Sequence, residues 1–187
     1  LIVIGLVVII AIGSAFVHLY NEKVYWQEDA AQYNHYHWEE LNLMASTIEN
    51  IGFTKEGIKE IYPYINAKVF SCTAGLYPAF HGDAAYAFFL NTYYIGLAQD
   101  IIGSEDFTDE KLQEAIDIFK DATLTLKELT MDILKMYEQE KDKFLNSAYS
   151  PTFVIEPIKK GLSRAIEMID RRISLYISEL SFCDFFH

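Results

Sequence analysis

The residues best suited to chemistry gather between positions 32 and 40, in the sequence QYNHYHWEE. This stretch holds two histidines, two tyrosines, a tryptophan and two glutamates. Imidazole and carboxylate groups are common metal ligands and common general acids and bases. The stretch therefore raises the question of a metal or catalytic site.

Helical spacing divides this cluster. His35 and Glu39 share one face of a helix and His37 and Glu40 share another, while the two histidines point in roughly opposite directions. The stretch therefore offers two separate His and Glu pairs, each needing further ligands from another helix. The Glu-x-x-His repeat of dimetal bundles and the HExxH motif are both absent. A half-buried structural His37 is favoured, and the weaker metal candidates are His35, His37, Glu39 and Glu40.

A second candidate site lies around His81, in the sequence YPAFHGD. Cys72 precedes it and Asp83 follows it, which suggests a nucleophile with its base. No cation that would activate the thiol lies nearby in sequence, so a packed thiol and a loop histidine are favoured. Cys72 and Cys183 fit no zinc spacing, and either a disulfide or two free thiols would suit them.

The first twenty residues, LIVIGLVVIIAIGSAFVHLY, carry no formal charge, and the first acid is Glu22. As a helix they would extend about 30 Å at about 1.5 Å per residue, the thickness of a bilayer's hydrocarbon core. We therefore predict a transmembrane helix over residues 1–21. A signal peptide cleaved near GSA at 13–15 and a buried core helix are the competing interpretations.

The residues after this run predict how the rest of the chain is organised. They carry one lysine against Glu22, Glu28 and Asp29, so a single-pass protein with its domain on the extracytoplasmic side is expected. No proline or glycine occurs between Ser14 and Gly52, which predicts that the spanning helix continues into a helical bundle domain, residues 22–187.

Turn and cap residues divide the remainder into helices. Gly52 is expected to end the first helix, Thr54 and Thr108 to cap two others, and Pro63 and Pro157 to break the chain. An apolar helix is expected after Asp83, and two amphipathic helices should follow, from 108 to about 146 and from 158 onwards. No strand pattern is present. The predicted fold is all-α: an N-terminal transmembrane helix continuing into an antiparallel bundle of about four main helices, counting the first helix and these three.

The composition excludes several classes of function. The chain has 187 residues with 27 acidic and 15 basic side chains, a formal net charge of -12, which disfavours nucleic-acid binding. Hydrophobic residues make up 51%, so the chain is not a disordered polyanion. No Walker, GxGxxG, GxSxG or EF-hand motif is present, so we predict no cofactor and favour a protein that is not an enzyme.

Two surfaces suggest contacts with other chains. The last helix contains every arginine of the chain, and its basic residues would suit an acidic neighbour such as another copy, or else form a solvated face paired with Glu167 and Asp170. The C-terminal LSFCDFF is unusually aromatic for a chain end. The predicted interaction residues are Lys159, Lys160, Arg164, Arg171, Arg172, Phe182, Phe185 and Phe186.

Three functions are compatible with the sequence. We favour a non-enzymatic, membrane-anchored helical protein that acts by protein-protein association, as a homo- or hetero-oligomeric subunit of a membrane complex or of a surface or filament assembly. The first alternative is a sensor or receptor domain that binds a small ligand inside the bundle, with pocket residues His81, Tyr86, Asn91, Tyr93 and Tyr94. The second is a metal-dependent membrane enzyme.

Overall fold

The computed structural model describes the backbone of residues 2–76, 86–87, 89–139 and 152–177. It describes the side chains of 11–22, 35–74, 86–87, 89–136, 138–139 and 159–176. All of its elements within these ranges are helical, which confirms the all-α prediction: α1 (Ile2–Ile51), α2 (Lys55–Leu76), the π-helical turn η1 (Leu90–Tyr94), α4 (Ile95–Ile102), the 3-10 turn η2 (Ser104–Asp106), α5 (Asp109–Gln139) and α7 (Thr152–Ile177).

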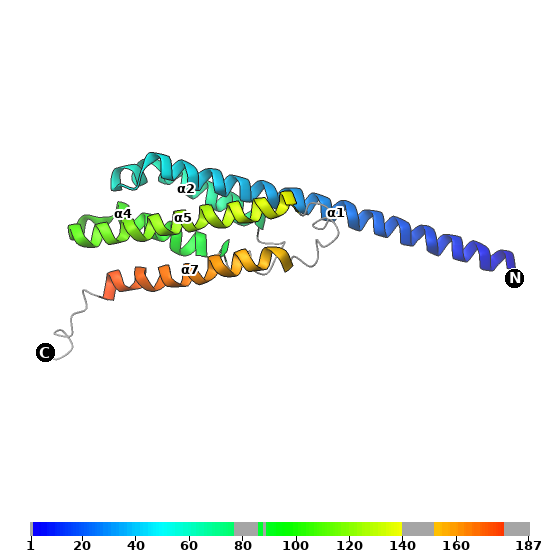
Figure 1. Ribbon diagram of the computed structural model, residues 1–187. Helices are drawn as coiled ribbons and strands as arrows, with labels where there is room; N and C mark the ends of the chain where they lie inside the picture. The colour runs from blue at the N-terminus through cyan, green and yellow to red at the C-terminus, as the bar shows by residue number, and fades with distance from the viewer. Residues whose placement is uncertain (1, 77–85, 88, 140–151, 178–187) are drawn as a thin grey trace.

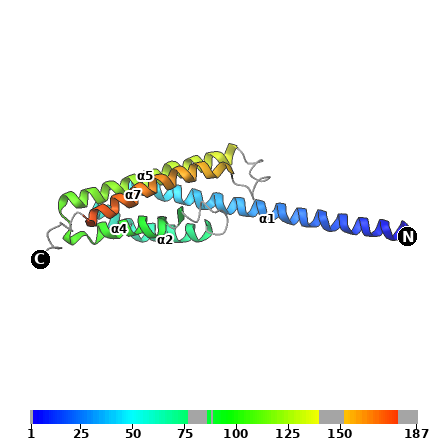
Figure 2. The same cartoon turned by 90° about the horizontal axis from the view of Figure 1, so that it is seen from below.

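Helix α1 is one unbroken helix of 50 residues, as the lack of internal proline and glycine predicted. Its second half lies in the bundle, and its first half projects far beyond the other helices (Figures 1 and 2). Gly52 ends it with φ of +96°, a backbone conformation that glycine adopts readily.

The two predicted threonine caps are confirmed. At the start of α2, the Gly57 amide donates to the Thr54 hydroxyl at 3.1 Å. At the start of α5, the Lys111 amide donates to the Thr108 hydroxyl at 3.3 Å. Each hydroxyl satisfies one of the amides that a helix leaves without a partner in its first turn.

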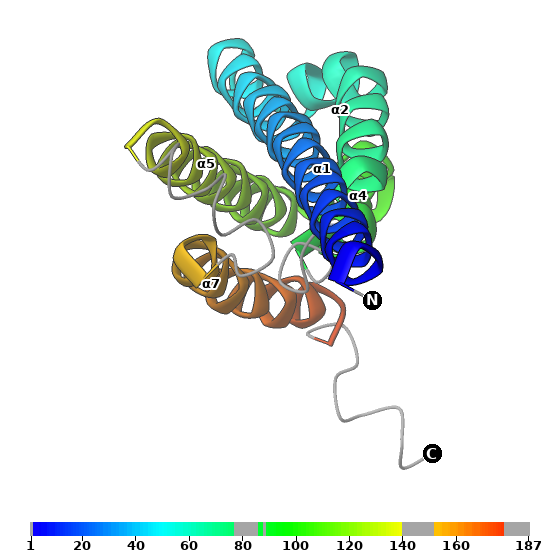
Figure 3. The same ribbon diagram turned by 90° about the vertical axis from the view of Figure 1, so that its right-hand side faces the viewer.

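Four helices pack in a ring, in which α1 contacts α2 and α5, and α4 contacts the same two helices (Figure 3). Helix α7 lies outside the ring, and its main packing partner is α5. The predicted bundle of four main helices was incomplete because it left out α2. Four apolar residues of α2 are at most 1% exposed, namely Ile58, Ile65, Val69 and Cys72.

The expectation that Pro63 and Pro157 would break the chain was wrong, because α2 continues through Pro63 and α7 continues through Pro157. A proline removes one hydrogen bond from a helix interior, and tertiary packing can offset that cost. In α2, Ile61 and Ile65 on either side of Pro63 are both buried, while Pro63 itself is exposed.

None of the helices, as far as the described residues go, combines the length and apolarity needed to cross a membrane. The predicted transmembrane helix at residues 1–21 is therefore not confirmed by the structure.

Candidate functional site

The projecting half of α1 exposes apolar side chains that the bundle does not cover. Every residue from 11 to 22 is exposed. Five large apolar residues in this stretch are between 59% and 74% exposed: Ile12, Phe16, Val17, Leu19 and Tyr20. Folded monomers rarely leave such a dense apolar surface in water, and one usually marks a contact with a membrane or another chain.

The charged part of α1 begins immediately after this apolar stretch. His18 and Glu22 lie one helical turn apart, with 3.9 Å between the imidazole and the carboxylate, and both side chains are exposed. A polar pair at the end of an apolar stretch is typical of helices that leave a hydrophobic environment for water.

The histidines at 35 and 37 occupy different environments, as helical spacing predicted. His35 lies 3.7 Å from the Glu39 carboxylate, on the accessible side of α1. His37 is only 4% exposed, and burial lowers its pKa below the ordinary value of 6.5. The carboxylate of Glu40 accepts a hydrogen bond from the Lys68 ammonium of α2. Among the described residues, no group of three or more His, Cys, Asp or Glu side chains is placed to hold a metal ion.

Cys72 does not have the environment of a catalytic nucleophile. Its side chain is free and 1% exposed, and burial raises the pKa of the thiol to about 11. The thiolate that would attack a substrate is therefore scarce at neutral pH. His81, Asp83 and Cys183 lie outside the described residues.

The predicted ligand-pocket residues after position 85 are spread over different parts of the bundle. Tyr86 is buried beside Trp38, with 6.5 Å between the ring centroids. Asn91 lies on an exposed face of η1, where its amide donates to the Thr73 hydroxyl of α2. Of these two side chains, the first is buried in the core and the second lies at the surface.

Tyr93 and Tyr94 do line one pocket, of about 210 Å³ including space open to solvent, between η1, α4, α5 and α7. Its other lining residues are Phe89, Leu97, Ala122, Met168 and Arg172. The Tyr94 hydroxyl is hydrogen-bonded to Thr123 at 2.8 Å, and Arg172 donates to Asp100. The Tyr94 hydroxyl and the Arg172 guanidinium already have partners within the bundle, and most of the other lining residues are apolar, so this pocket offers mainly an apolar surface.

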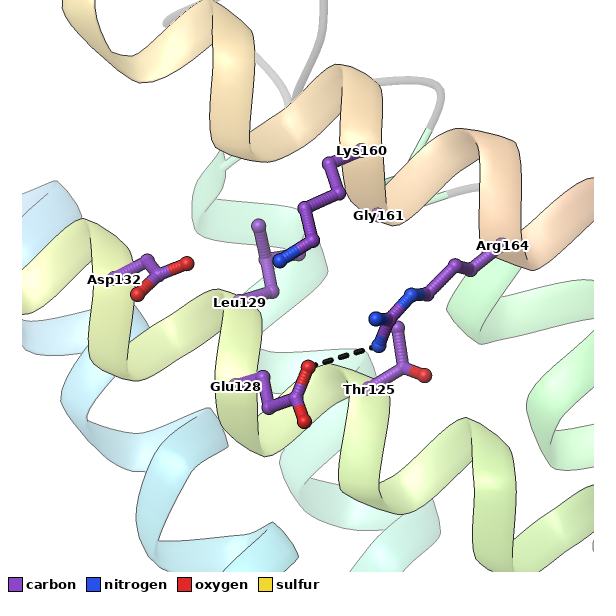
Figure 4. Close-up of a pocket in the computed structure, with 7 residues that line it drawn as sticks. All are labelled: Thr125, Glu128, Leu129, Asp132, Lys160, Gly161 and Arg164. Carbon is purple, nitrogen blue, oxygen red and sulfur yellow. Dashed lines mark hydrogen bonds and ion pairs between the residues drawn. The ribbon is translucent and has the colours of Figure 1, made fainter.

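The three arginines of α7 pair with acidic residues of other helices. Arg164 donates to Glu128 of α5 at 2.8 Å, and Arg171, seven residues later, donates to Asp121, seven residues earlier in α5, at 2.6 Å. This antiparallel register also places Lys160 and Asp132 in the pocket of about 220 Å³ that Figure 4 shows. Neither of the two alternatives for these residues, an acidic neighbouring chain or pairing with Glu167 and Asp170, included these pairs, because the partners lie far away in sequence.

Arg172 makes the least exposed of these contacts. It donates to Asp100 of α4 at 2.7 Å, with the two side chains 21% and 15% exposed. Its guanidinium lies against Gly96, where a Cβ atom would come within 2.8 Å of it. The sequence analysis did not predict this contact. The one feature that could have indicated it is Gly96, which leaves room for a side chain of another helix.

The π-helical turn η1 was also missed, because the uncharged sequence around Asn91 predicts an ordinary buried helix. Such turns often occur near functional sites. The interaction residues Phe182, Phe185 and Phe186 lie outside the described residues. Comparisons with protein-family models, with curated proteins and with solved structures find no match for this chain.

Proposed function

We propose that this chain is a membrane-anchored, non-enzymatic helical protein that acts by association with other chains, and that the first half of α1 is its anchor. The observation that carries the proposal is the difference in exposure along α1. Ile12 and Phe16 are 62% and 74% exposed, whereas Leu41 and Ile48 of the same helix are 0% and 1% exposed.

The sequence supports a lipid environment for the anchor. Residues 1–20 contain no Asp, Glu, Lys or Arg, although such residues make up 22% of the chain. Exposure of such a helix to water is unfavourable, by roughly 25 cal/mol for each Å² of exposed apolar area. A bilayer accepts such a helix because the helix satisfies its own backbone hydrogen bonds.

The bundle supports a role in association. Within the described part of the chain, several carboxylates are engaged with basic side chains: Glu40 with Lys68, Asp100 with Arg172, and Glu128 with Arg164. Cys72 and His37 are buried in their uncharged forms. An anchored bundle of this kind presents surfaces to other chains and positions them at the membrane.

Vesicle flotation tests the proposal. The full chain is mixed with phosphatidylcholine vesicles, and the fraction that floats with them is measured for Ile12→Asp and, as a matched control, for Phe70→Asp. Phe70 lies on α2 and is 72% exposed, so both substitutions place a carboxylate at an exposed apolar site. A charge near the middle of a spanning helix costs about 2.5–3.5 kcal/mol, so Ile12→Asp should abolish flotation while Phe70→Asp leaves it unchanged.

Size measurement by light scattering, without lipid, distinguishes the other outcomes. A chain that stays monomeric in buffer and does not float would contradict the anchor. A chain that forms a soluble oligomer, dispersed by Ile12→Asp, would show that α1 packs on protein and would replace the lipid anchor with an assembly helix.

A further inference from the structure

Helix α7 is bound to the bundle differently from the four helices of the ring. Each ring helix has two main neighbours in the ring, whereas α7 packs mainly along α5 (Figures 2 and 3). The ring therefore closes through contacts among its own four helices, and α7 adds Ala165, Met168 and Leu175 to the core from outside the ring.

Among the described side chains of α7, those at 159–176, four residues are buried: Gly161, Ala165, Met168 and Leu175. Two of these four are small, and a Cβ atom at Gly161 would lie 3.0 Å from Leu129 of α5. By contrast, α1 buries large apolar side chains at no more than 1% exposure, namely Trp38, Leu41, Met44 and Ile48. Because hydrophobic stabilisation scales with buried apolar area, α7 contributes less of it than α1 does.

Polar contacts provide the rest of the attachment of α7. The pairs of Arg164 with Glu128 and of Arg171 with Asp121 join side chains that are all between 42% and 60% exposed. Exposed pairs of this kind are weak and are screened by salt.

The Arg172 contact is better protected than these pairs. The guanidinium passes over Gly96 to reach Asp100. Burial, followed by the nearby Asp100 carboxylate, raises the pKa of Tyr176, one turn further along α7, to about 12. Arg172, Asp100 and Gly96 therefore form one latch between α7 and α4.

We propose that α7 is a releasable helix: it leaves α5 as a unit while the ring of α1, α2, α4 and α5 stays folded, and Arg172 on Gly96 and Asp100 is the latch that holds it. Release uncovers the side of α5 that carries Leu129. It also frees an α7 that is apolar over a wider face than the bundle uses, since Ile166 and Ile173 are already 59% and 47% exposed.

Hydrogen exchange on the full chain in detergent micelles tests this proposal. Local opening lets the amides of one element exchange without global unfolding. Amides of α7 between 162 and 175 should exchange at least about tenfold faster than those of α1 between 41 and 48. Equal protection of the two segments would overturn the proposal, because α7 would then open only with the whole bundle.

Gly96→Ala tests the latch separately from general stability. Alanine is a better helix former than glycine, so α4 itself should gain stability, while the new methyl group displaces the Arg172 guanidinium. Exchange should therefore become faster in α7 and not in α1. Gly13→Ala is the matched control, because a Cβ atom there meets no other residue within 4 Å.

Asp100→Asn is a second variant, which removes the negative charge that Arg172 binds and keeps a side chain of similar size. It should also accelerate exchange in α7 alone. The latch is excluded if both Gly96→Ala and Asp100→Asn leave α7 exchange unchanged, or if they accelerate α1 as much as α7.

Discussion

Helix α5 contacts α1 and α7, and exposed ion pairs make up a smaller share of the first interface, which has the pair of Lys127 with Glu49, than of the second. Towards α1, Thr130 is completely buried and accepts a hydrogen bond from Asn42 at 2.7 Å. Towards α7, the buried residues are Ala165, Met168 and Leu175, and the partners of Arg164 and Arg171 are half exposed. Both interfaces therefore combine burial with ion pairs, and exposed ion pairs contribute a larger share of what holds α7 than of what holds α1.

The largest expected difference between the two helices concerns isoleucine truncation, because α1 buries Ile48 whereas α7 leaves Ile173 about half exposed. Ile48→Ala in α1 should lower the free energy of unfolding by about 2–5 kcal/mol, because the 1% exposed side chain leaves a cavity in the core. Ile173→Ala in α7 should cost less than about 1 kcal/mol, because that side chain is 47% exposed. Denaturant unfolding measures both, and equal losses would refute the asymmetry.

A smaller effect is expected at the hydrogen bond between α1 and α5. Thr130→Val removes the acceptor of Asn42 in a buried position and should cost about 1–3 kcal/mol in unfolding free energy. Thr47→Val is the matched control, since the Thr47 hydroxyl only donates to Leu43 one turn back on an accessible face of α1. Its effect should stay within about 0.5 kcal/mol. A similar loss in both variants would show that the buried hydrogen bond contributes no more to stability than the accessible one.

The sequence predicted where helices begin and end better than it predicted which helices pack against one another. Gly52, Thr54 and Thr108 act locally, within one turn of the backbone groups they bind, so their roles were predictable from spacing alone. The place of α2 in the ring was not, because burial of Ile58 and Ile65 depends on which helices meet. The predicted break at Pro63 was wrong for the same reason, since the packing of its neighbours outweighs the one hydrogen bond that proline removes.

The candidate sites show the same limit. Helical spacing separated His35 from His37 correctly, because both lie on one helix. The partners of Arg164 and Arg171 lie 36 and 50 residues away, and only the antiparallel register of α5 and α7 brings them together. Once that register is known, the seven-residue spacing on both helices predicts the pairs.

Acid should lower the stability of the fold through His37 of α1. Burial lowers the pKa of His37 in the folded state. In acid, His37 therefore binds a proton more tightly in the unfolded chain than in the folded chain, and this favours unfolding. The stability that the neutral imidazole contributes is complete above about pH 6.5 and is lost as the pH falls through the folded pKa.

Thermal unfolding from pH 7.5 to 5 measures this effect. His37→Gln should show a shallower loss of stability with acid than the original chain. Because desolvation is the largest cause of the shift, the difference should persist in 1 M salt. A His37→Gln chain with the original pH dependence would show that another group is responsible.

The smallest expected effect lies on the α7 side, in the pair of Arg171 with Asp121. A double-mutant cycle with Arg171→Gln and Asp121→Asn should give a coupling of about 0.2–1 kcal/mol at low salt, because both side chains are about half exposed. In 1 M salt, where the screening length falls to about 3 Å, the coupling should disappear. The Asn42 and Thr130 cycle is the control, since a hydrogen bond between uncharged groups should keep its coupling in salt. A salt-resistant coupling at Arg171 would mean that this pair is held by burial as α1 is, and the distinction between the two interfaces of α5 would be lost.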